Sequence, residues 1–206
     1  MPLTEQMPKP MIEFGGSTLI ERGIVKLRPA IPNIHITVGY KGAMLAQHVI
    51  GLGVSSVFNT EGHGNAWWIF NTLLKYLNQP VLVLTADNVT ELDFDLLYKE
   101  YKRLSEPACM VVPVEPIDGL VGDFIHHKNN VVHELSRSKP SPIYCSGIQM
   151  LNPDKINRLV RESDDFYKVW GQLIQLNELK CSDVYPKNWF TVDTPEQLDL
   201  LRKRTI

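Results

Sequence analysis

Asp87 is an acidic residue at a position where chemistry could occur. It follows Val81–Leu84, the most apolar strand-like run in the chain. Ligands of open α/β sheets bind outside the carboxyl ends of the strands, and a carboxylate there can hold Mg²⁺ against substrate phosphates. The pair Asp87-Asn88 also suits a turn into the next element. The strand alone does not separate these two interpretations.

A second carboxylate, Asp193, stands directly before Thr194-Pro195-Glu196. Pro is favoured in the first turn of a helix, and Asp and Thr are good capping residues, so the segment predicts a helix start. Capping explains an aspartate at this position as well as metal binding does, and both interpretations stay open on these residues alone.

Two lysines lie beside prolines. Lys9 lies between Pro8 and Pro10, and Lys139 precedes Pro140. Proline fixes its own φ and biases the preceding residue toward extended backbone, so Lys9 is expected on a stiff loop. A rigid cation near developing negative charge assists phosphoryl-type transfer. A lone lysine is more often an ordinary surface residue.

Glycines mark two further segments. In the segment 62–66, Gly64 and Asn65 precede a predicted helix. Glycine there allows close backbone approach, and a helix N-terminus favours anions. Gly147 lies inside a strand-like run, where a glycine at a β-bulge is the ordinary explanation.

Strand-like and helical segments alternate through the first half of the chain. Strands are predicted at 34–38, 54–58, 81–84 and 109–114, and helices at 43–50, 65–77 and 94–104. The continuous Val/Leu run at 81–84 suits a central parallel strand covered on both faces. The alternation predicts an α/β fold, a Rossmann-like three-layer sandwich with a mixed, mainly parallel sheet.

The pattern changes after Pro116. Strands without intervening helices are predicted at 123–127, 131–135 and 143–150, which indicates a small antiparallel addition at the open end of the sheet. Pro153 begins a further helix. The chain has 206 residues and no internal repeat or linker, so we expect a single domain over residues 1–206.

The composition is that of a soluble globular protein, with 44% hydrophobic and 21% charged residues. The formal charge of −2 argues against a nucleic-acid-binding surface. No apolar run is long enough to span a bilayer, and the N-terminus lacks signal-peptide features. The cysteines are far apart and in no metal-type pairing, so we expect reduced thiols in a cytoplasmic protein.

Three motifs, taken in order, resemble a known family. Residues 2–11 read PLTEQMPKPM, residues 81–88 read VLVLTADN, and residues 189–198 read WFTVDTPEQL. This order resembles the nucleotidyltransferases that join a nucleoside triphosphate to a sugar phosphate or phosphocholine and release pyrophosphate. The resemblance extends from Pro2 to about Leu201 and implies a nucleotidyltransferase-like domain.

The resemblance implies a role for each candidate residue. Asp87 and Asp193 would hold Mg²⁺, while Lys9 and Lys139 would stabilise charge on the phosphates. The residues implied to contact the nucleotide or the acceptor are Gly64, Asn65 and Gly147. The implied partners are a nucleoside triphosphate and a phosphorylated small-molecule acceptor, which we expect to be a sugar phosphate. A homo-oligomer is possible on the sequence alone.

Two departures from the family pattern bear on the acceptor. Ser138 stands where a glutamate often contacts sugar hydroxyls, and a hydroxyl cannot replace the acceptors of a carboxylate. In many sugar-nucleotide members the corresponding aspartate lies two residues earlier than Asp193. In cytidylyltransferase-like members it lies at the position of Asp193. The alternative acceptor is therefore phosphocholine or a related amino-alcohol phosphate, with Trp68, Tyr144 and Trp189 as candidate cage residues. A tryptophan such as Trp68 more often belongs to a core.

The family's first strand and glycine-rich, arginine-bearing loop come just before the segment that matches Pro2–Met11. Met1 stands at that point here. This departure motivates an alternative of another class, a catalytically weak nucleotide-sugar binding or regulatory protein. The same departure predicts weak triphosphate binding. It also predicts a gap in the sheet where the first strand would lie. Another segment, a partner chain or upstream residues would fill this gap, because unpaired buried backbone groups are costly.

Overall fold

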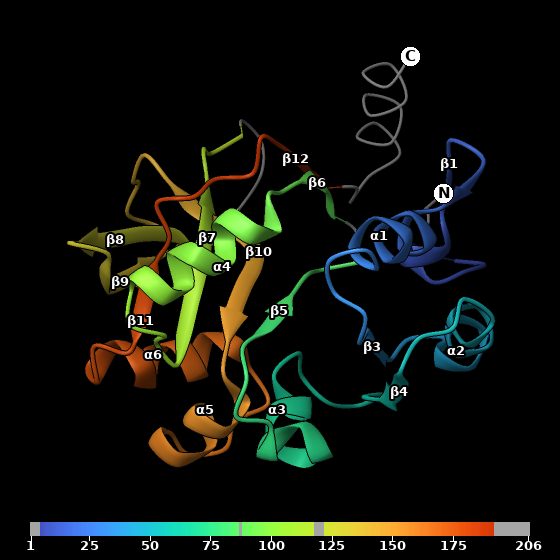
Figure 1. The fold of residues 1–206 in the computed structure, drawn as a ribbon, viewed down its shortest axis with the longest axis horizontal. Helices are drawn as coiled ribbons and strands as arrows, with labels where there is room; N and C mark the ends of the chain where they lie inside the picture. The colour runs from blue at the N-terminus through green and yellow to red at the C-terminus, as the bar shows by residue number, and fades with distance from the viewer. Residues whose placement is uncertain (1–4, 87, 118–121, 192–206) are drawn as a thin grey trace. The chain divides into compact units, whose positions relative to one another are not determined.

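The structure, a computed structural model, describes residues 5–86, 88–117 and 122–191 (Figure 1). The chain forms two compact units. The N-terminal unit comprises residues 1–63, 86–90 and 190–206, and the sheet unit comprises residues 64–85 and 91–189. No helix among the described residues has the length and apolar character needed to cross a membrane.

The sheet unit is built on a six-stranded mixed sheet with the order β5-β10-β7-β11-β9-β8. Its strands are β5 (Val81–Val83), β7 (Cys109–Val114), β8 (Phe124–Lys128), β9 (Val131–Ser136), β10 (Tyr144–Leu151) and β11 (Leu179–Cys181). β7 and β11 are parallel. β10 runs antiparallel to both β5 and β7, and it also meets β8 at the pair Tyr144 and Phe124.

Helices cover both faces of this sheet, which confirms the predicted α/β sandwich. α4 (Phe94–Arg103) covers one face, and α3 (Trp67–Asn71), α5 (Pro153–Leu159) and α6 (Phe166–Gln175) pack on the other. Side chains alternate between the faces of a strand. Met110 and Val112 of β7 therefore pack in the cluster with α4, while Cys109 and Val111 pack in the cluster with α6.

Capping residues fix where these helices begin. The side chain of Asp93 accepts a hydrogen bond from Leu96 N–H at the start of α4, and that of Asn152 does so from Lys155 N–H at the start of α5. Pro153 occupies the first turn of α5, as predicted. The helix predicted at 65–77 is interrupted: α3 ends before Thr72, whose extended backbone separates it from the 3₁₀ turn η2 (Leu73–Tyr76).

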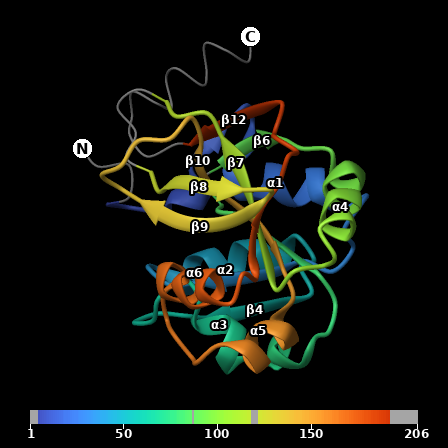
Figure 2. The same ribbon diagram turned by 90° about the vertical axis from the view of Figure 1, so that its left-hand side faces the viewer.

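Two strand assignments differ from the sequence prediction. β5 is the end strand in the order of the six-stranded sheet and pairs antiparallel with β10, so its prediction as a central parallel strand is wrong. It is covered on both faces, because Val81 and Val83 pack in one cluster and Leu82 and Leu84 in the other. An apolar run indicates that both faces of a strand are covered, but it does not indicate whether the neighbouring strand runs parallel or antiparallel. The strand predicted at 143–150 is β10, which lies between β5 and β7 in the six-stranded sheet and not in an added hairpin. The antiparallel addition is the hairpin β8–β9 alone (Figure 2).

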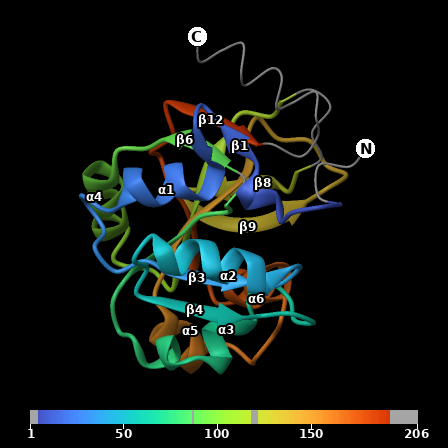
Figure 3. The same cartoon turned by 90° about the vertical axis from the view of Figure 1, so that its right-hand side faces the viewer.

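The N-terminal unit contains a parallel two-stranded sheet, β3 (His35–Val38) and β4 (Ser56–Asn59). Two helices pack on it, α1 (Leu19–Leu27) and α2 (Gly42–Gly51) (Figure 3). The buried residues of this core are Ile20, Ile24, Ile34, Val38, Leu45 and Val49. α1 was not predicted from the sequence, although Thr18 caps it by accepting a hydrogen bond from Glu21 N–H.

Shorter elements complete the described chain. η1 (Lys9–Met11) is a 3₁₀ turn, and β1 (Glu13–Phe14) pairs antiparallel with β2 (Ser17–Thr18). β6 (Asn88–Glu91) and β12 (Asn188–Thr191) form a separate two-stranded sheet.

Candidate functional site

The two predicted metal ligands, Asp87 and Asp193, lie outside the described residues. Within residues 5–86, 88–117 and 122–191, no group of three or more His, Cys, Asp or Glu side chains could hold a metal ion. The described strands next to the two acids are nevertheless informative, because Asn88 begins β6 and Thr191 ends β12.

The direction of the β6–β12 pair follows from its contacts. The Lys187 N–H, just before β12, donates to the carbonyl oxygen of Glu91 at the end of β6, with an N–O distance of 2.8 Å. The Asn188 amide donates to the Glu91 carboxylate at 2.8 Å. The start of β12 therefore meets the end of β6, and the strands run antiparallel. Val89 and Phe190 pack on the same small core, as this direction requires.

The backbone around Lys9 is ordered by the flanking prolines. Lys9 begins η1, which Pro8 precedes with an extended backbone. The Met11 N–H donates to the Pro8 carbonyl at 2.9 Å, and the Ile12 N–H donates to the Lys9 carbonyl at 3.1 Å. Lys9 thus lies in a hydrogen-bonded 3₁₀ turn and not in an extended segment, and the stiffness of this loop stays a prediction.

Lys139 lies in the sheet unit and forms an ion pair. Its Nζ is 2.7 Å from Oε2 of Glu134 on β9, and the two side chains are 59% and 40% exposed. The hydrogen bond from Lys139 holds the pKa of the Glu134 carboxyl below its ordinary value, and the charges of Lys139, His126 and His133 act in the same direction. Lys9 belongs to the other unit, so its convergence with Lys139 stays a prediction.

Gly64 and Asn65 hold their loop against the segment that precedes α6. A Cβ atom on Gly64 would lie 2.2 Å from the carbonyl oxygen of Asp164, so no larger residue fits without movement. The Asn65 side-chain oxygen accepts a hydrogen bond from Phe166 N–H at 3.0 Å, and the Ala66 N–H donates to the Asp164 carbonyl at 2.8 Å. These contacts account for both residue types structurally, and nucleotide contact by this loop stays a prediction.

Gly147 lies at an irregularity of β10. Its φ is +81°, and the register of β10 against β7 shifts between Cys145 and Gln149. Glycine is favoured there because other residues rarely adopt this φ. The Ser146 carbonyl beside it accepts a hydrogen bond from the Trp189 indole at 3.0 Å. The bulge that the sequence left open is present, and close approach of an acceptor stays a prediction.

Two of the three residues considered for a choline cage, Trp68 and Tyr144, are enclosed by the protein, and a cage role for Trp189 stays a prediction. Trp68 is only 7% exposed and packs in the core with α5 and α6, so its interpretation as a cage residue is wrong. The Tyr144 ring is 3% exposed and meets the rings of Phe124 and Trp189 edge to face, with centroids 6.2 and 5.9 Å away. A Cβ atom on Gly122 would lie 2.6 Å from the same ring. The tyrosine face is therefore occupied by the protein itself.

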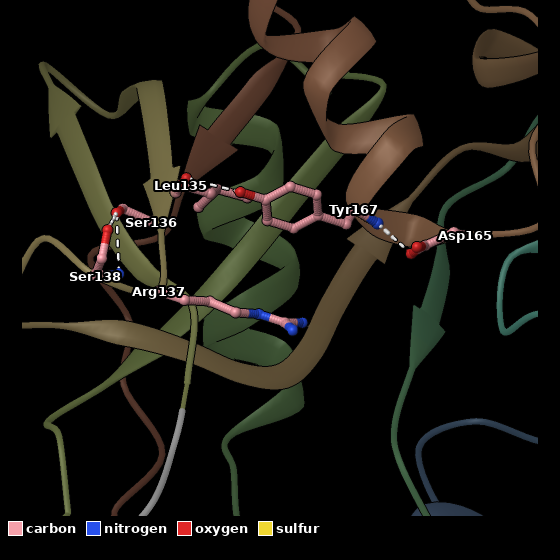
Figure 4. A pocket seen from close by; sticks show the side chains of 6 residues that line it. All are labelled: Leu135, Ser136, Arg137, Ser138, Asp165 and Tyr167. Atoms are coloured by element: carbon pink, nitrogen blue, oxygen red, sulfur yellow. Dashed lines mark hydrogen bonds between the residues drawn. The ribbon is translucent and has the colours of Figure 1, made fainter.

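The sheet unit contains a hollow of about 370 Å³ that was not predicted from the sequence (Figure 4). Its lining residues are Leu135, Ser136, Arg137, Ser138, Asp165 and Tyr167. They come from the end of β9, the segment just before Lys139, and the start of α6. The arginine in the run Ser-Arg-Ser-Lys-Pro was the available signal, but only the fold shows that α6 lies against it.

Comparison with known proteins agrees with this geometry. The sequence profile of the nucleotidyl transferase family matches residues 1–120. A mannose-1-phosphate guanyltransferase of Pichia angusta is 27% identical over 95% of the chain and 57% of its own length. A probable mannose-1-phosphate guanylyltransferase 2 of Oryza sativa subsp. japonica is 23% identical over 99% of the chain and 63% of its own length. The chain thus spans about 57–63% of the length of these curated relatives.

Solved structures share the fold. A putative glucose-1-phosphate thymidylyltransferase from Bacillus anthracis matches with a TM-score of 0.80 and 17% identity, covering 100% of this chain and 90% of that one. A CTP:phosphocholine cytidylyltransferase from Streptococcus pneumoniae matches with a TM-score of 0.73 and 21% identity, covering 100% and 92%. Since the family profile covers more than half of the chain and the fold is the same, the chain belongs to the nucleotidyl transferase family.

Proposed function

We propose that this protein is a nucleotidyltransferase that moves a nucleoside monophosphate from a nucleoside triphosphate to a sugar phosphate and releases pyrophosphate. The observation that carries the proposal is the antiparallel pairing of β6 with β12. Asp87 directly precedes β6, and Asp193 follows β12 by two residues. This pairing supports a shared site for both carboxylates, because the start of one strand adjoins the end of the other.

In the proposed reaction, a phosphate oxygen of the acceptor attacks the α-phosphorus in line. The new P–O bond forms as the bond to the pyrophosphate leaving group breaks, and no covalent enzyme intermediate is needed. Mg²⁺ bound by Asp87 and Asp193 would neutralise phosphate charge. Lys9 and Lys139 would stabilise negative charge that builds up during the transfer, so positioning and electrostatics account for the rate.

A sugar phosphate is favoured over phosphocholine as the acceptor. A quaternary ammonium group needs exposed aromatic faces, whereas Trp68 is buried in a core and the Tyr144 ring is enclosed. The guanylyltransferase relatives, which match over nearly the whole chain, are named for mannose 1-phosphate.

The test is pyrophosphate release with Mg²⁺ and a matrix of nucleotides and acceptors. Hexose 1-phosphates are assayed with GTP and dTTP, and phosphocholine with CTP. Asp87→Asn and Asp193→Asn should each lower kcat by at least about 100-fold, the usual cost of losing a group that stabilises transition-state charge. Asp95→Asn, at an exposed position in α4, is the control. Release with phosphocholine alone, or full activity in both acid variants, would overturn the proposal. Nucleotide-sugar binding without any turnover would favour the regulatory alternative.

A further inference from the structure

The hollow beside β9 and α6 has an arginine in its wall, Arg137, that forms one ion pair. Arg137 Nε donates to Oδ1 of Asp123 at 2.8 Å, and its guanidinium lies 5.9 Å from the Tyr167 ring centroid. The hydrogen bond to Asp123 raises the pKa of Arg137, so the group stays charged. Both terminal nitrogens of its planar fork lack a hydrogen-bond partner among the described residues. Arg137 is thus bonded at Nε, and its terminal nitrogens can donate to a ligand; Figure 4 shows its side chain among the lining residues of the hollow.

The facing wall is held by the first residues of α6. The Tyr167 hydroxyl donates to the Leu135 carbonyl at 3.1 Å, which ties the ring to β9. Asp165 caps α6 by accepting the Tyr167 N–H at Oδ1, at 2.8 Å. Its other carboxylate oxygen has no partner among the described side chains. The hollow therefore has a carboxylate acceptor and a guanidinium donor in its lining, each with one hydrogen bond to the protein.

The two serines add hydroxyl groups at the edge of the hollow. Ser136 Oγ accepts hydrogen bonds from the N–H groups of Ser138 and Lys139, at 3.3 and 3.0 Å. It also lies 3.5 Å from Ser138 Oγ. With its lone pairs engaged, the Ser136 hydroxyl is left to act as a donor. The bond from Lys139 N–H joins the hollow directly to the lysine proposed to bind phosphate.

The charges select the class of ligand. Arg137 is already paired with Asp123, which lies outside the lining residues, and the hollow itself contains the carboxylate of Asp165, so these charges together disfavour an anion. An ammonium ligand would need the Tyr167 face that Arg137 already covers. Neighbouring hydroxyls of a sugar ring suit the arrangement, since each can donate to a carboxylate and accept from an N–H group. The ring's C–H face can pack against Leu135, which also lines the hollow.

We propose that this hollow binds the hydroxyl-bearing ring of a sugar through Arg137 and Asp165, with Tyr167 shaping its wall. The inference rests on the proposed function in one respect: the ring is that of the acceptor, whose phosphate would reach Lys139. Arg137 and Asp165 then take the place of the carboxylate that Ser138 lacks. The pair determines specificity for a hexose 1-phosphate over an amino-alcohol phosphate.

The test measures binding alone, without nucleotide or turnover. Affinities for hexose 1-phosphate and for inorganic phosphate are compared by calorimetry in wild type, Arg137→Met and Asp165→Asn. Asparagine is also a good N-cap, so α6 is retained. Hexose 1-phosphate affinity should fall about 10-fold in Arg137→Met and several-fold in Asp165→Asn, as loss of charge-assisted hydrogen bonds implies. Phosphate affinity should not change. Arg158→Met, at an exposed ion pair on α5, is the matched control.

The outcomes separate this inference from the proposed function. Equal losses for both ligands would make Arg137 a phosphate ligand and overturn the inference, as would unchanged hexose 1-phosphate binding in both variants. Turnover of sugar phosphates with no effect of either variant would leave the proposed function standing and remove this site. Binding of hexose 1-phosphate that depends on Arg137, without any turnover, would support this site and contradict the proposed function. Circular dichroism checks that each variant folds. If Arg137→Met does not fold, the binding result for Asp165→Asn decides whether the inference stands.

Discussion

The ammonium group of Lys139 and the carboxylate of Glu134 lie 2.7 Å apart, and both side chains reach solvent. An exposed ion pair of this kind contributes only about 0–1 kcal/mol. It can still compete with a ligand, because a phosphate that binds Lys139 must first draw it away from Glu134. The residue that the family resemblance assigns to phosphate is thus held by a neighbour that the sequence analysis did not consider.

Glu134→Gln should therefore lower KM for the phosphorylated acceptor by about 2- to 5-fold, since the competing charge is lost. The effect should grow at low ionic strength, where screening is weaker. Lys139→Met should raise KM, and the double variant should behave like Lys139→Met. Steady-state kinetics over a salt series checks this. A higher KM in Glu134→Gln would show that Glu134 itself assists the acceptor.

The cysteines at 109, 145 and 181 form no disulfide in the structure, and their reduced state in the cell stays a prediction. Burial raises the pKa of Cys181 to about 12 and also raises those of Cys109 and Cys145. Only the thiolate is a nucleophile. The native protein should therefore react slowly with a disulfide reagent at mildly alkaline pH, and all three thiols should react after unfolding in guanidinium. Fast labelling of Cys109 or Cys181 in the native protein would contradict the burial of these two residues.

Among the elements, α4 is tied to the segment after β11 by Glu100, which is 7% exposed. Glu100 accepts hydrogen bonds from Arg103 at 2.7 Å and from Asp183 N–H at 2.9 Å. Arg103 also reaches the Asp183 carboxylate at 2.7 Å. Glu100 thus joins two segments that are distant in sequence.

The hydrogen bond from Arg103 lowers the pKa of the Glu100 carboxyl in the folded state. Its contribution to the free energy of unfolding is therefore fully present above the carboxyl's unfolded pKa, and is lost as pH falls through the lower, folded pKa. Glu100→Gln should cost about 1–3 kcal/mol at neutral pH, because it removes charge-assisted hydrogen bonds. Denaturant titrations across the acid range should show a smaller loss at low pH. An equal loss at every pH would contradict an electrostatic origin.

The loop before α3 allows a matched pair of glycine substitutions. Gly64→Ala should destabilise by about 1–3 kcal/mol, because the new methyl group meets the Asp164 carbonyl at 2.2 Å. Gly171, inside α6, has nothing within 4 Å of an added Cβ. Gly171→Ala should stabilise by up to about 1 kcal/mol through helix propensity. Thermal unfolding of both variants checks the contrast, and similar changes in the two would refute the packing role of Gly64.

Elements with a strong local signal were predictable. α2, α4, α5, β3 and β7 were all predicted close to their observed positions. α6 was missed, although Phe166, Val169, Trp170 and Leu173 repeat at helical spacing after the cap Asp165. The central place of β10 and the edge place of β5 were not predictable, because strand order depends on partners distant in sequence. The same holds for the hollow, whose walls are about thirty residues apart along the chain, as Leu135 and Tyr167 illustrate.

For the whole molecule, the sequence predicts a single domain, and the chain forms two compact units that are each discontinuous in sequence. Residues 86–90 and 190–206 return to the N-terminal unit from within and after the sheet unit. β6 and β12 each cross a unit boundary along the chain, and they pair with each other. Neither unit can be cut out as one continuous segment, and the paired strands contribute residues to both.

We therefore expect one cooperative unfolding transition. Loss of the β6–β12 pair would remove residues from both units at once, so neither should melt alone. In calorimetry, the measured enthalpy should equal the van't Hoff enthalpy, as two-state unfolding requires. Mg²⁺ with a nucleoside triphosphate should raise Tm without splitting the transition, because a ligand that binds only the folded state stabilises all of it. Two resolved transitions, or a ligand shift confined to one of them, would show that the units are separate domains. Asp87→Asn should remove the ligand-induced shift and leave the transition single.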